Sequence, residues 1–286
     1  MRIRTLSLLL VAAAFVVVMP AGAAAPARAP LVAFSAEHDG NADVYVAALD
    51  GSGLRRLTTA PGADFDPSWS PDRRRIAYRC QVGTSSDICI VDLDGGPSLD
   101  VTNTPGDEWS PAWSPDGRWI AFFSDRADLG SIWLMHPDGS EAHRLIAGAE
   151  YPAWSSDGRV IAYSDMRTRD IALARADGSH RQLLSRNPAY DMSPSISLNG
   201  RLMAFDSQRG FRHVRERGIG PEFEIYRMGI GGRFARRLTR NQVEDRFPDF
   251  GPGGRIIFSR GGRLWIVGED GRHARRLPLD GSFPDW

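Results

Sequence analysis

The amino-acid sequence predicts an all-β protein, a six-bladed β-propeller of four-stranded antiparallel blades closed by pairing of its N- and C-terminal strands. Three observations support this. A Pro-x-Trp-Ser-Pro-Asp-Gly motif, complete at 111–117, recurs with a spacing of about 40–45 residues, the period of four-stranded propeller blades. Short apolar segments separated by turn sequences accompany each copy, and the last copy stops after its first strand. The large residue of the motif falls at Trp69, Trp113, Trp154, Ile196, Phe250 and Trp286.

Each repeat contains the same elements in the same order. The motif strand is followed by an apolar strand at 31–34, 76–78, 120–123, 161–163, 202–205 and 256–258. A further strand follows at 44–46, 88–91, 132–135, 171–173, 225–228 and 264–267. A turn, usually Asp-Gly, leads to a last strand that is predicted to end at 56–58, 101–102, 144–145, 183–184, 237–239 and 276–277. Asp-Gly supplies the positive-φ positions of tight turns, so each repeat is predicted to be an antiparallel meander.

The two ends of the chain are predicted to complete one blade together. The first apolar segment, 31–34, corresponds to the second strand of a repeat, and 284–286 corresponds to a first strand. We therefore expect these segments to lie side by side, so that the propeller spans residues 31–286 and has no open sheet edge.

Composition excludes one class of partner. The chain has 35 basic and 35 acidic residues, and every basic residue other than histidine is arginine. Because proteins that bind nucleic acid usually carry a net basic charge, no nucleic-acid partner is expected.

The N-terminus has the pattern of an export signal. Arg2 and Arg4 precede an apolar run at 6–18, and small residues follow, with cleavage expected between about Ala23 and Ala29. Residues 1–25 are accordingly interpreted as a signal peptide, and an uncleaved anchor is the alternative. The mature protein is expected to be a periplasmic or secreted monomer without a membrane span.

Cys80 and Cys89 are the only cysteines, and they lie on two successive predicted strands. Export would place them in an oxidising compartment, where a cross-hairpin disulfide can form. The sequence leaves open whether the pair is bridged, because bridging depends on a geometry that only the fold determines.

Strand order predicts where binding residues lie. The Ser-Pro-Asp-Gly turns and the Asp-Gly turns lie on one face of the ring. The variable loops and the links between blades lie on the opposite face. Acidic residues precede each motif strand, and six-fold repetition would place them around the mouth of the channel, where they could bind a basic partner segment or Ca²⁺. The alternative is that each acid bonds backbone N–H groups or an arginine of its own blade. These candidates are Asp64, Asp107, Glu108, Glu150, Asp191, Glu244, Asp245 and Asp280.

An insertion at 209–221 departs most from the repeat. It could contact a partner through Phe211 as an apolar anchor and through Arg212 and Arg215 as ligands for carboxylates or phosphates. The alternative is a solvated surface loop, since insertions in such loops cost little.

The I-A-F, D-I-Y, D-G, R-L-T and P-x-W-S-P-D-G segments together resemble the TolB-like PD40 class of propeller repeats, over essentially residues 31–286. TolB takes part in a trans-envelope complex and binds the Pal lipoprotein, so the resemblance implies a propeller scaffold for protein interaction in the envelope. The segment before residue 31 is too short for the α/β domain that precedes the TolB propeller, so a stand-alone propeller is expected. The chain also lacks the G-x-S-x-G elbow of the peptidases that carry related propellers.

Three functional hypotheses remain from the sequence. The first is a non-catalytic scaffold that binds a protein or peptide on the variable-loop face and needs no cofactor. The second is a propeller enzyme that acts on glycans as a lyase or hydrolase, although the histidines are scattered over different blades. The third is a glycan-binding module that uses Trp109 and Tyr151.

Overall fold

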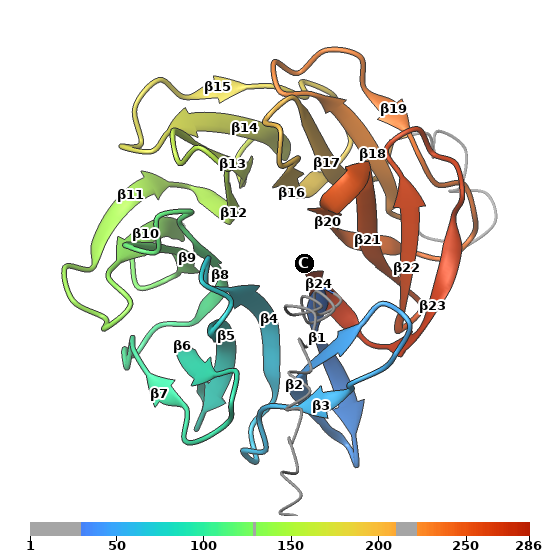
Figure 1. Ribbon diagram of the computed structural model, residues 1–286. Helices are drawn as coiled ribbons and strands as arrows, with labels where there is room; N and C mark the ends of the chain where they lie inside the picture. The colour runs from blue at the N-terminus through green and yellow to red at the C-terminus, as the bar shows by residue number, and fades with distance from the viewer. Residues whose placement is uncertain (1–29, 128–129, 210–221) are drawn as a thin grey trace, which may run out of the picture.

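Six four-stranded antiparallel sheets surround a central axis in the computed structural model (Figure 1). It describes residues 30–127, 130–209 and 222–286. The predicted signal peptide and the insertion residues Phe211, Arg212 and Arg215 lie outside these ranges. The predicted fold class is confirmed.

The blades are numbered 1 to 6 along the chain, and the innermost strand of each is given first. Blade 1 consists of β24 (Ser282–Asp285), β1 (Leu31–His38), β2 (Asn41–Ala48) and β3 (Arg55–Arg56). Blade 2 consists of β4 (Asp64–Trp69), β5 (Arg75–Val82), β6 (Ser85–Asp92) and β7 (Leu99–Asp100). Blade 3 consists of β8 (Glu108–Trp113), β9 (Ile120–Ser124), β10 (Ser131–Met135) and β11 (His143–Ala147).

The second half of the ring has the same order. Blade 4 consists of β12 (Ala149–Trp154), β13 (Val160–Asp165), β14 (Asp170–Arg175) and β15 (Gln182–Leu183). Blade 5 consists of β16 (Asp191–Ile196), β17 (Leu202–Ser207), β18 (Glu224–Gly229) and β19 (Arg236–Arg237). Blade 6 consists of β20 (Asp245–Gly251), β21 (Arg255–Arg260), β22 (Arg263–Gly268) and β23 (Arg275–Asp280), with a single 3₁₀ turn at Pro252–Gly254.

The hydrophobic core lies between blades. Each of six clusters of buried apolar side chains joins two neighbouring blades. Between blades 2 and 3, for example, Ile88 packs with Trp113 and Ile120. Burying one such isoleucine contributes about 1.5–3 kcal/mol, so the contacts between blades supply much of the stability of the ring.

The Ser-Pro-Asp-Gly motif builds the turn after each inner strand. In blade 3 the Ser114 hydroxyl donates to the Asp116 carboxylate at 2.6 Å, and this carboxylate also accepts the Arg118 backbone N–H at 3.1 Å. Gly117 follows with a φ of 70°, a conformation that favours glycine. The same arrangement recurs at Ser70 and Asp72 and at Ser155 and Asp157, so the motif is structural.

The R-L-T and D-I-Y segments also interlock. In blade 2 the Thr102 hydroxyl accepts the Ile88 backbone N–H at 2.9 Å and donates to Asp87 at 3.0 Å. The Thr102 hydroxyl thereby takes the place of the backbone carbonyl that would accept the next hydrogen bond of the sheet. For this reason several outer strands end earlier than the sequence predicted: β3 ends at Arg56 and β7 ends at Asp100.

A β-bulge interrupts every inner strand immediately before its motif proline, where the residue has a positive φ of about 50°. Such left-handed backbone is uncommon for residues other than glycine. The repetition in all six blades shows that the bulge belongs to the fold, and it places these residues in the wall of the channel. They are Asp66, Ser110, Tyr151, Ser193, Phe247 and Phe283.

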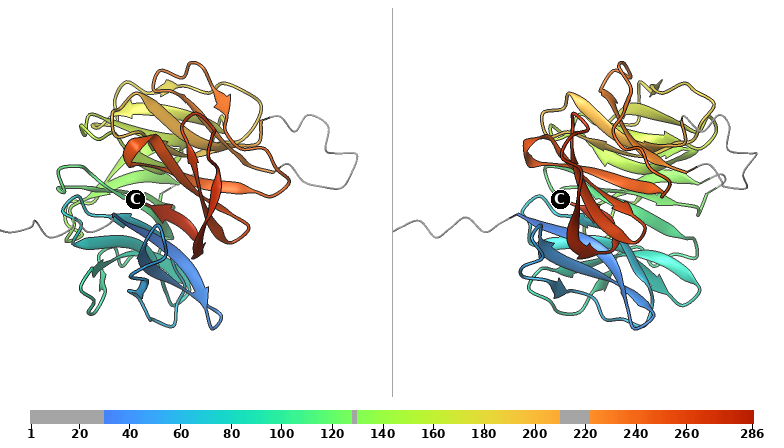
Figure 2. Two further views of the ribbon diagram at one scale, coloured as in Figure 1. Left: turned by 45° about the vertical axis from the view of Figure 1, so that its right-hand side comes forward. Right: turned by 90° about the vertical axis from the view of Figure 1, so that its right-hand side faces the viewer.

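The ring is closed by its two ends, as the truncated motif predicted. Strand β24 pairs with β1, with Ala33 opposite Asp285 and Ser35 opposite Ser282. Figure 1 shows the C-terminus at the centre of the ring. Figure 2 shows the same ring from the side, with strands running between its two faces.

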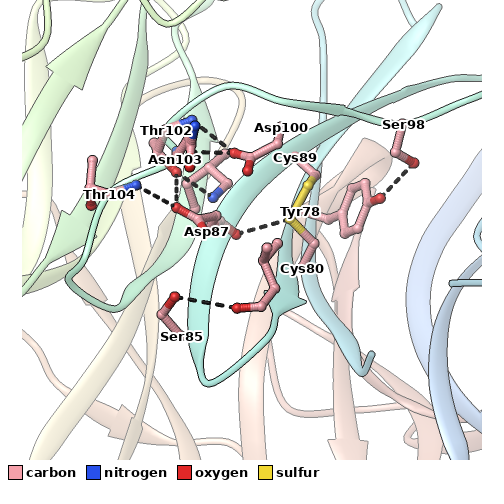
Figure 3. Close-up of a disulfide and its surroundings, with 12 residues drawn as sticks. Tyr78, Cys80, Ser85, Asp87, Cys89, Ser98, Asp100, Thr102, Asn103 and Thr104 are labelled. Carbon is pink, nitrogen blue, oxygen red and sulfur yellow. Dashed lines mark hydrogen bonds between the residues drawn. A yellow bond between two sulfur atoms is a disulfide. The ribbon is translucent and has the colours of Figure 1, made fainter. Parts of the chain in front are cut away.

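A disulfide joins Cys80 on β5 to Cys89 on β6, with 5.8 Å between their Cα atoms (Figure 3). Beside it, the Tyr78 hydroxyl lies 2.6 Å from that of Ser98. No helix in the described ranges is long and apolar enough to cross a bilayer.

Candidate binding site in the axial channel

The inner strands of all six blades enclose a cavity of about 380 Å³ on the ring axis. Its wall includes residues of the turns that follow the inner strands, namely Pro71, Pro115 and Leu198. The cavity is therefore entered from the face that carries the Ser-Pro-Asp-Gly turns, the face opposite the variable loops. Leu198 is exposed at this entrance.

Aromatic side chains form much of the wall. The bulges contribute Tyr151, Phe247 and Phe283, and the motif positions contribute Trp154 and Trp286. The rings of Phe247 and Phe283 lie 3.9 Å apart between centroids, and those of Tyr151 and Phe247 lie 6.4 Å apart. The proline that follows each bulge also lines the cavity. These rigid surfaces suit an apolar or cationic group.

Two carboxylates, Asp249 and Asp285, lie in the wall on neighbouring inner strands. Burial raises the pKa of Asp285 to about 8, with a further contribution from the nearby charge of Asp249. Burial likewise raises the pKa of Asp249 to about 6, although the Ser195 hydroxyl and the backbone N–H groups that it accepts favour the charged form. The guanidinium of Arg73, which also lines the cavity, lowers both pKa values by a smaller amount.

These carboxylates belong to a set of contacts between blades. Asp285 accepts the Trp69 backbone N–H at 2.7 Å, and Asp249 accepts that of Trp286 at 2.9 Å. In both cases the side chain between the proline and the large residue of one motif binds the backbone of the next blade. The six residues at this position are Ser68, Ala112, Ala153, Ser195, Asp249 and Asp285.

The chemistry of this position makes the cavity asymmetric. The hydroxyls of Ser68 and Ser195 accept backbone N–H groups of the next blade at 3.3 and 3.0 Å. Ala112 and Ala153 offer no side-chain acceptor. One side of the wall is therefore acidic, at blades 6 and 1, and the side at blades 3 and 4 is apolar.

A third carboxylate lies deeper in the wall. Asp66 is 8% exposed, and its Oδ2 atom accepts the Ser110 backbone N–H at 3.3 Å. Its Oδ1 atom is buried without a hydrogen-bond partner. Burial raises the pKa of Asp66, and the charge of Arg79 partly opposes this rise. An unpartnered buried oxygen is costly, so this atom is a place where a bound donor would be stabilised.

The structure places four of the eight predicted acidic residues inside the blades. Glu108, Asp191 and Asp245 are fully buried, and each forms an ion pair with an arginine of its own blade. For these three residues the structure shows the alternative, pairing with an arginine of the same blade. The pairs are Glu108–Arg126 at 3.1 Å, Asp191–Arg209 at 2.5 Å and Asp245–Arg260 at 2.6 Å.

The other five acidic candidates do not gather at one point. Asp64 is buried, and this burial raises its pKa to about 6. Glu150 is half-buried, and its pKa is raised to about 7 for the same reason. Asp107 accepts a backbone N–H of β6 at 2.8 Å, Asp280 pairs with two arginines of blade 6, and Glu244 is exposed. In the described part of the chain, no three His, Cys, Asp or Glu residues are grouped so that they could hold a metal.

Sequence reasoning did not select Asp249, Asp285 or Arg73. A signal was present, because the motif position occupied by Ser or Ala in the first four copies carries Asp in the last two. The tryptophans have a double role: Trp69 and Trp113 are buried between blades, whereas Trp154 and Trp286 are also partly accessible in the cavity.

Comparisons with known proteins agree with this architecture. The model of the PD40 family, described as the TolB beta propeller domain, matches residues 80–218. TolB from Acinetobacter baumannii is 20% identical, with a TM-score of 0.74 over 90% of this chain and 66% of that one. Residues 80–218 therefore match the TolB beta propeller family, and the ring as a whole resembles TolB in fold.

Two other structures resemble this TolB-like propeller. A putative TolB from Agrobacterium tumefaciens is 20% identical, with a TM-score of 0.70 over 88% of this chain and 89% of that one. An oligogalacturonate lyase from Vibrio parahaemolyticus is 14% identical, with a TM-score of 0.55 over 85% of this chain and 73% of that one. At these identities the likeness concerns the fold alone, which supports both binding and enzymatic functions.

Proposed function

We propose that the chain is an exported, non-catalytic propeller scaffold that binds a protein or peptide of the cell envelope, with the axial cavity at the centre of the contact. The observation that carries the proposal is the cavity itself. It combines rigid aromatic and proline surfaces with a few polar groups, which is the composition of binding pockets. The resemblance to TolB supports an envelope role.

The internal ion pairs favour the cavity over the variable-loop face as the contact. Glu108, Asp191 and Asp245 are buried and paired, so a partner would have to break these pairs to use them. Breaking a buried pair costs about 3–5 kcal/mol, more than a typical new contact returns. The cavity wall requires no such rearrangement.

Site-specific photo-crosslinking in the native envelope tests this function. A photoreactive residue is placed at Leu198, at the cavity entrance, and in a matched variant at Val82, which is exposed at the β5–β6 turn on the opposite face. We expect one envelope protein to be captured from position 198 and not from position 82. The captured protein is then purified, and its affinity is measured for the wild type and for Leu198→Arg, which should bind at least about tenfold more weakly.

Other outcomes would redirect or reject the proposal. Capture from position 82 alone would move the contact to the variable-loop face, and capture from neither would contradict a protein partner. Export is tested separately by sequencing the N-terminus of protein recovered from the envelope, which should begin after a residue between about Ala23 and Ala29.

A glycan-directed enzyme is the second candidate, and one observation favours it. Asp249 and Asp285 are two carboxyl groups in an aromatic pocket, and their pKa values of about 6 and about 8 differ as those of an acid–base pair do. Incubation of the purified chain with oligogalacturonides and other oligosaccharides, followed by mass spectrometry, tests this candidate. Shortened products that disappear with Asp285→Asn would support it, and intact oligosaccharides would contradict it.

A further inference from the structure

We propose that the axial cavity binds an organic cation, an ammonium or guanidinium group carried on an apolar stem. This deepens the proposed function, on which it rests, because the basic side chain of a partner peptide is one source of such a group. A free alkyl amine is the other source.

The charges in the wall favour a cation. Asp66, Asp249 and Asp285 line the cavity, whereas Arg73 is the one guanidinium among its lining residues. Arg73 is already engaged, because it donates to the Leu31 carbonyl oxygen at 2.5 Å and its Cζ atom lies 4.0 Å from the centre of the Trp69 ring. The wall therefore offers three carboxyl groups that can become charged beside a cation, and its one guanidinium is already engaged.

Two oxygen positions can receive the donors of the cation. The Oδ1 atom of Asp66 is buried and unpartnered, and because Asp66 lines the cavity, a small rotation of its carboxyl group would let a bound N–H group satisfy this oxygen. Asp285 uses its Oδ2 atom for the Trp69 backbone, and its side chain is partly accessible in the cavity wall. Asp249 is more fully used, because it accepts from both Ser195 and Trp286. We therefore expect Asp285 and Asp66 to carry most of the interaction.

The remaining wall suits the stem of such a ligand. Ala112 and Ala153 make one side apolar, and the rings of Tyr151, Phe247 and Phe283 form an aromatic cluster in the wall. Aromatic faces attract ammonium and guanidinium groups, most strongly where water is excluded. A volume of about 380 Å³ is at the small end for ligand sites, which fits one side chain rather than a folded segment.

Binding should be coupled to proton release. Because the pKa of Asp285 is raised to about 8 and that of Asp249 to about 6, the pair holds protons near neutral pH. A bound cation favours the charged carboxylate, so a proton leaves and affinity increases as pH rises through this interval. Arg73 faces the pair from the turn after β4, and Ser195 on β16 donates to Asp249 without titrating in this range.

Further titratable groups around the site stand on β4, β5 and β12. Asp66 on β4 faces Arg79 of β5, and Tyr151 stands on β12. Burial raises the pKa of Tyr151 far above neutrality, so its hydroxyl stays neutral throughout the interval. The pH dependence of cation binding should therefore come mainly from Asp285 and Asp249.

Isothermal titration calorimetry of the purified full-length chain tests the proposal with three probes. These are Nα-acetyl-lysine methylamide, its uncharged analogue Nα-acetyl-norleucine methylamide, and butylamine. We expect the lysine probe to bind at least about tenfold more tightly than the norleucine probe, and more tightly near pH 8.5 than near pH 6. Titrations in two buffers of different ionisation enthalpy should show release of protons.

Variants then locate the site. Asp285→Asn and Asp66→Asn should each weaken the lysine probe about tenfold or more, because each removes a carboxyl group that can become charged when the cation binds. Asp177→Asn makes the same change at an exposed turn of blade 4 and should leave the affinity unchanged. Thermal unfolding of each variant verifies that it is folded. Because two different cavity residues are changed, a folding defect in one variant still leaves the other as a test.

The results separate this inference from the proposed function. Equal affinity for the lysine and norleucine probes, or unchanged affinity in both cavity variants, would overturn the cation site even if position 198 still captures a partner. Butylamine that binds as well as the lysine probe would identify a free amine as the source. Preference for the lysine probe would identify a side chain of a peptide.

Discussion

The Asp285 carboxylate accepts a hydrogen bond of 2.7 Å from the Trp69 backbone N–H, across 216 positions of the chain. Strand β24 therefore binds on two sides, to β1 through the backbone and to β4 through this side chain. The backbone N–H of Trp286 in turn bonds to Asp249 of blade 6. The end of the chain is thus held by three neighbouring blades, and the same carboxylates line the cavity.

The fit of Trp286 gives a first prediction. A Cβ atom at Gly251 would lie 2.1 Å from carbons of the Trp286 ring, so Gly251→Ala must displace the ring. We expect the free energy of unfolding to fall by about 1–3 kcal/mol, as for other overpacked cores. At the exposed Gly231 no atom lies within 4 Å of such a Cβ, and Gly231→Ala should change stability little. Urea unfolding of both variants checks this, and equal effects would contradict it.

Stability should fall as pH rises toward alkaline values. A carboxyl group whose pKa is higher in the folded than in the unfolded state binds its proton more tightly when folded. Its contribution is complete below its ordinary pKa and is lost as pH rises to the folded value. For Asp285 this window runs from its ordinary 3.8 to about 8. Asp285→Asn keeps an oxygen acceptor for Trp69 and should flatten the upper part of the decline.

Urea unfolding between pH about 5 and about 8.5 measures this slope. Asp116→Asn is the matched control, since hydrogen bonding by Ser114 lowers the pKa of Asp116 and confines its effect to more acidic solutions. Identical slopes for the wild type and Asp285→Asn would show that Asp285 does not titrate with the raised pKa.

Buried and exposed ion pairs of blade 6 should contribute differently to the free energy of unfolding. Arg260 binds both oxygens of the buried Asp245, at 2.6 and 2.7 Å. Arg260→Ala leaves a buried charge unpaired and should lower the free energy of unfolding by about 3–5 kcal/mol. Arg276 binds the exposed Asp280 at 3.1 Å, and Arg276→Ala should cost less than about 1 kcal/mol. Equal losses in denaturant unfolding would refute the role of burial.

The disulfide closes a short loop, since Cys80 and Cys89 are separated by nine positions. A cross-link that closes a loop of this length lowers the entropy of the unfolded chain. It thereby stabilises the folded state by about 2–3 kcal/mol. The double variant Cys80→Ser, Cys89→Ser should lose about this amount, and reduction of the wild type should give a similar loss. Unfolding with and without reductant provides the measurement, and a reductant effect that persists in the double variant would exclude the disulfide as its cause.

The sequence predicted the fold well because its signals are repeated. The Pro-x-Trp strand and the turn after it occur in successive blades, so a weak pattern at one position is supported by its equivalents. The truncated copy ending at Trp286 predicted closure through the pairing that β24 and β1 adopt. Outer strands were less well defined, because residues such as Thr102 use side chains in place of ladder hydrogen bonds.

The binding cavity was harder to predict, because it depends on which way side chains point across a bulge. Glu108 and Asp245 precede the bulges and are buried in pairs within their own blades. Asp249 and Asp285 follow the bulges and lie in the wall of the channel. A period-two strand pattern does not contain the extra residue of a bulge, so the sequence could not separate the two groups of acids.

The pairing of β24 with β1 also affects biosynthesis. Until residues 282–285 have been synthesised, β1 has a partner only in β2, and its other edge displays unsatisfied backbone groups. A nascent chain of this protein therefore carries an unpaired strand edge from the synthesis of β1 until that of β24, and such edges pair readily with other chains. The demand for chaperones should consequently be greatest just before the last strand emerges.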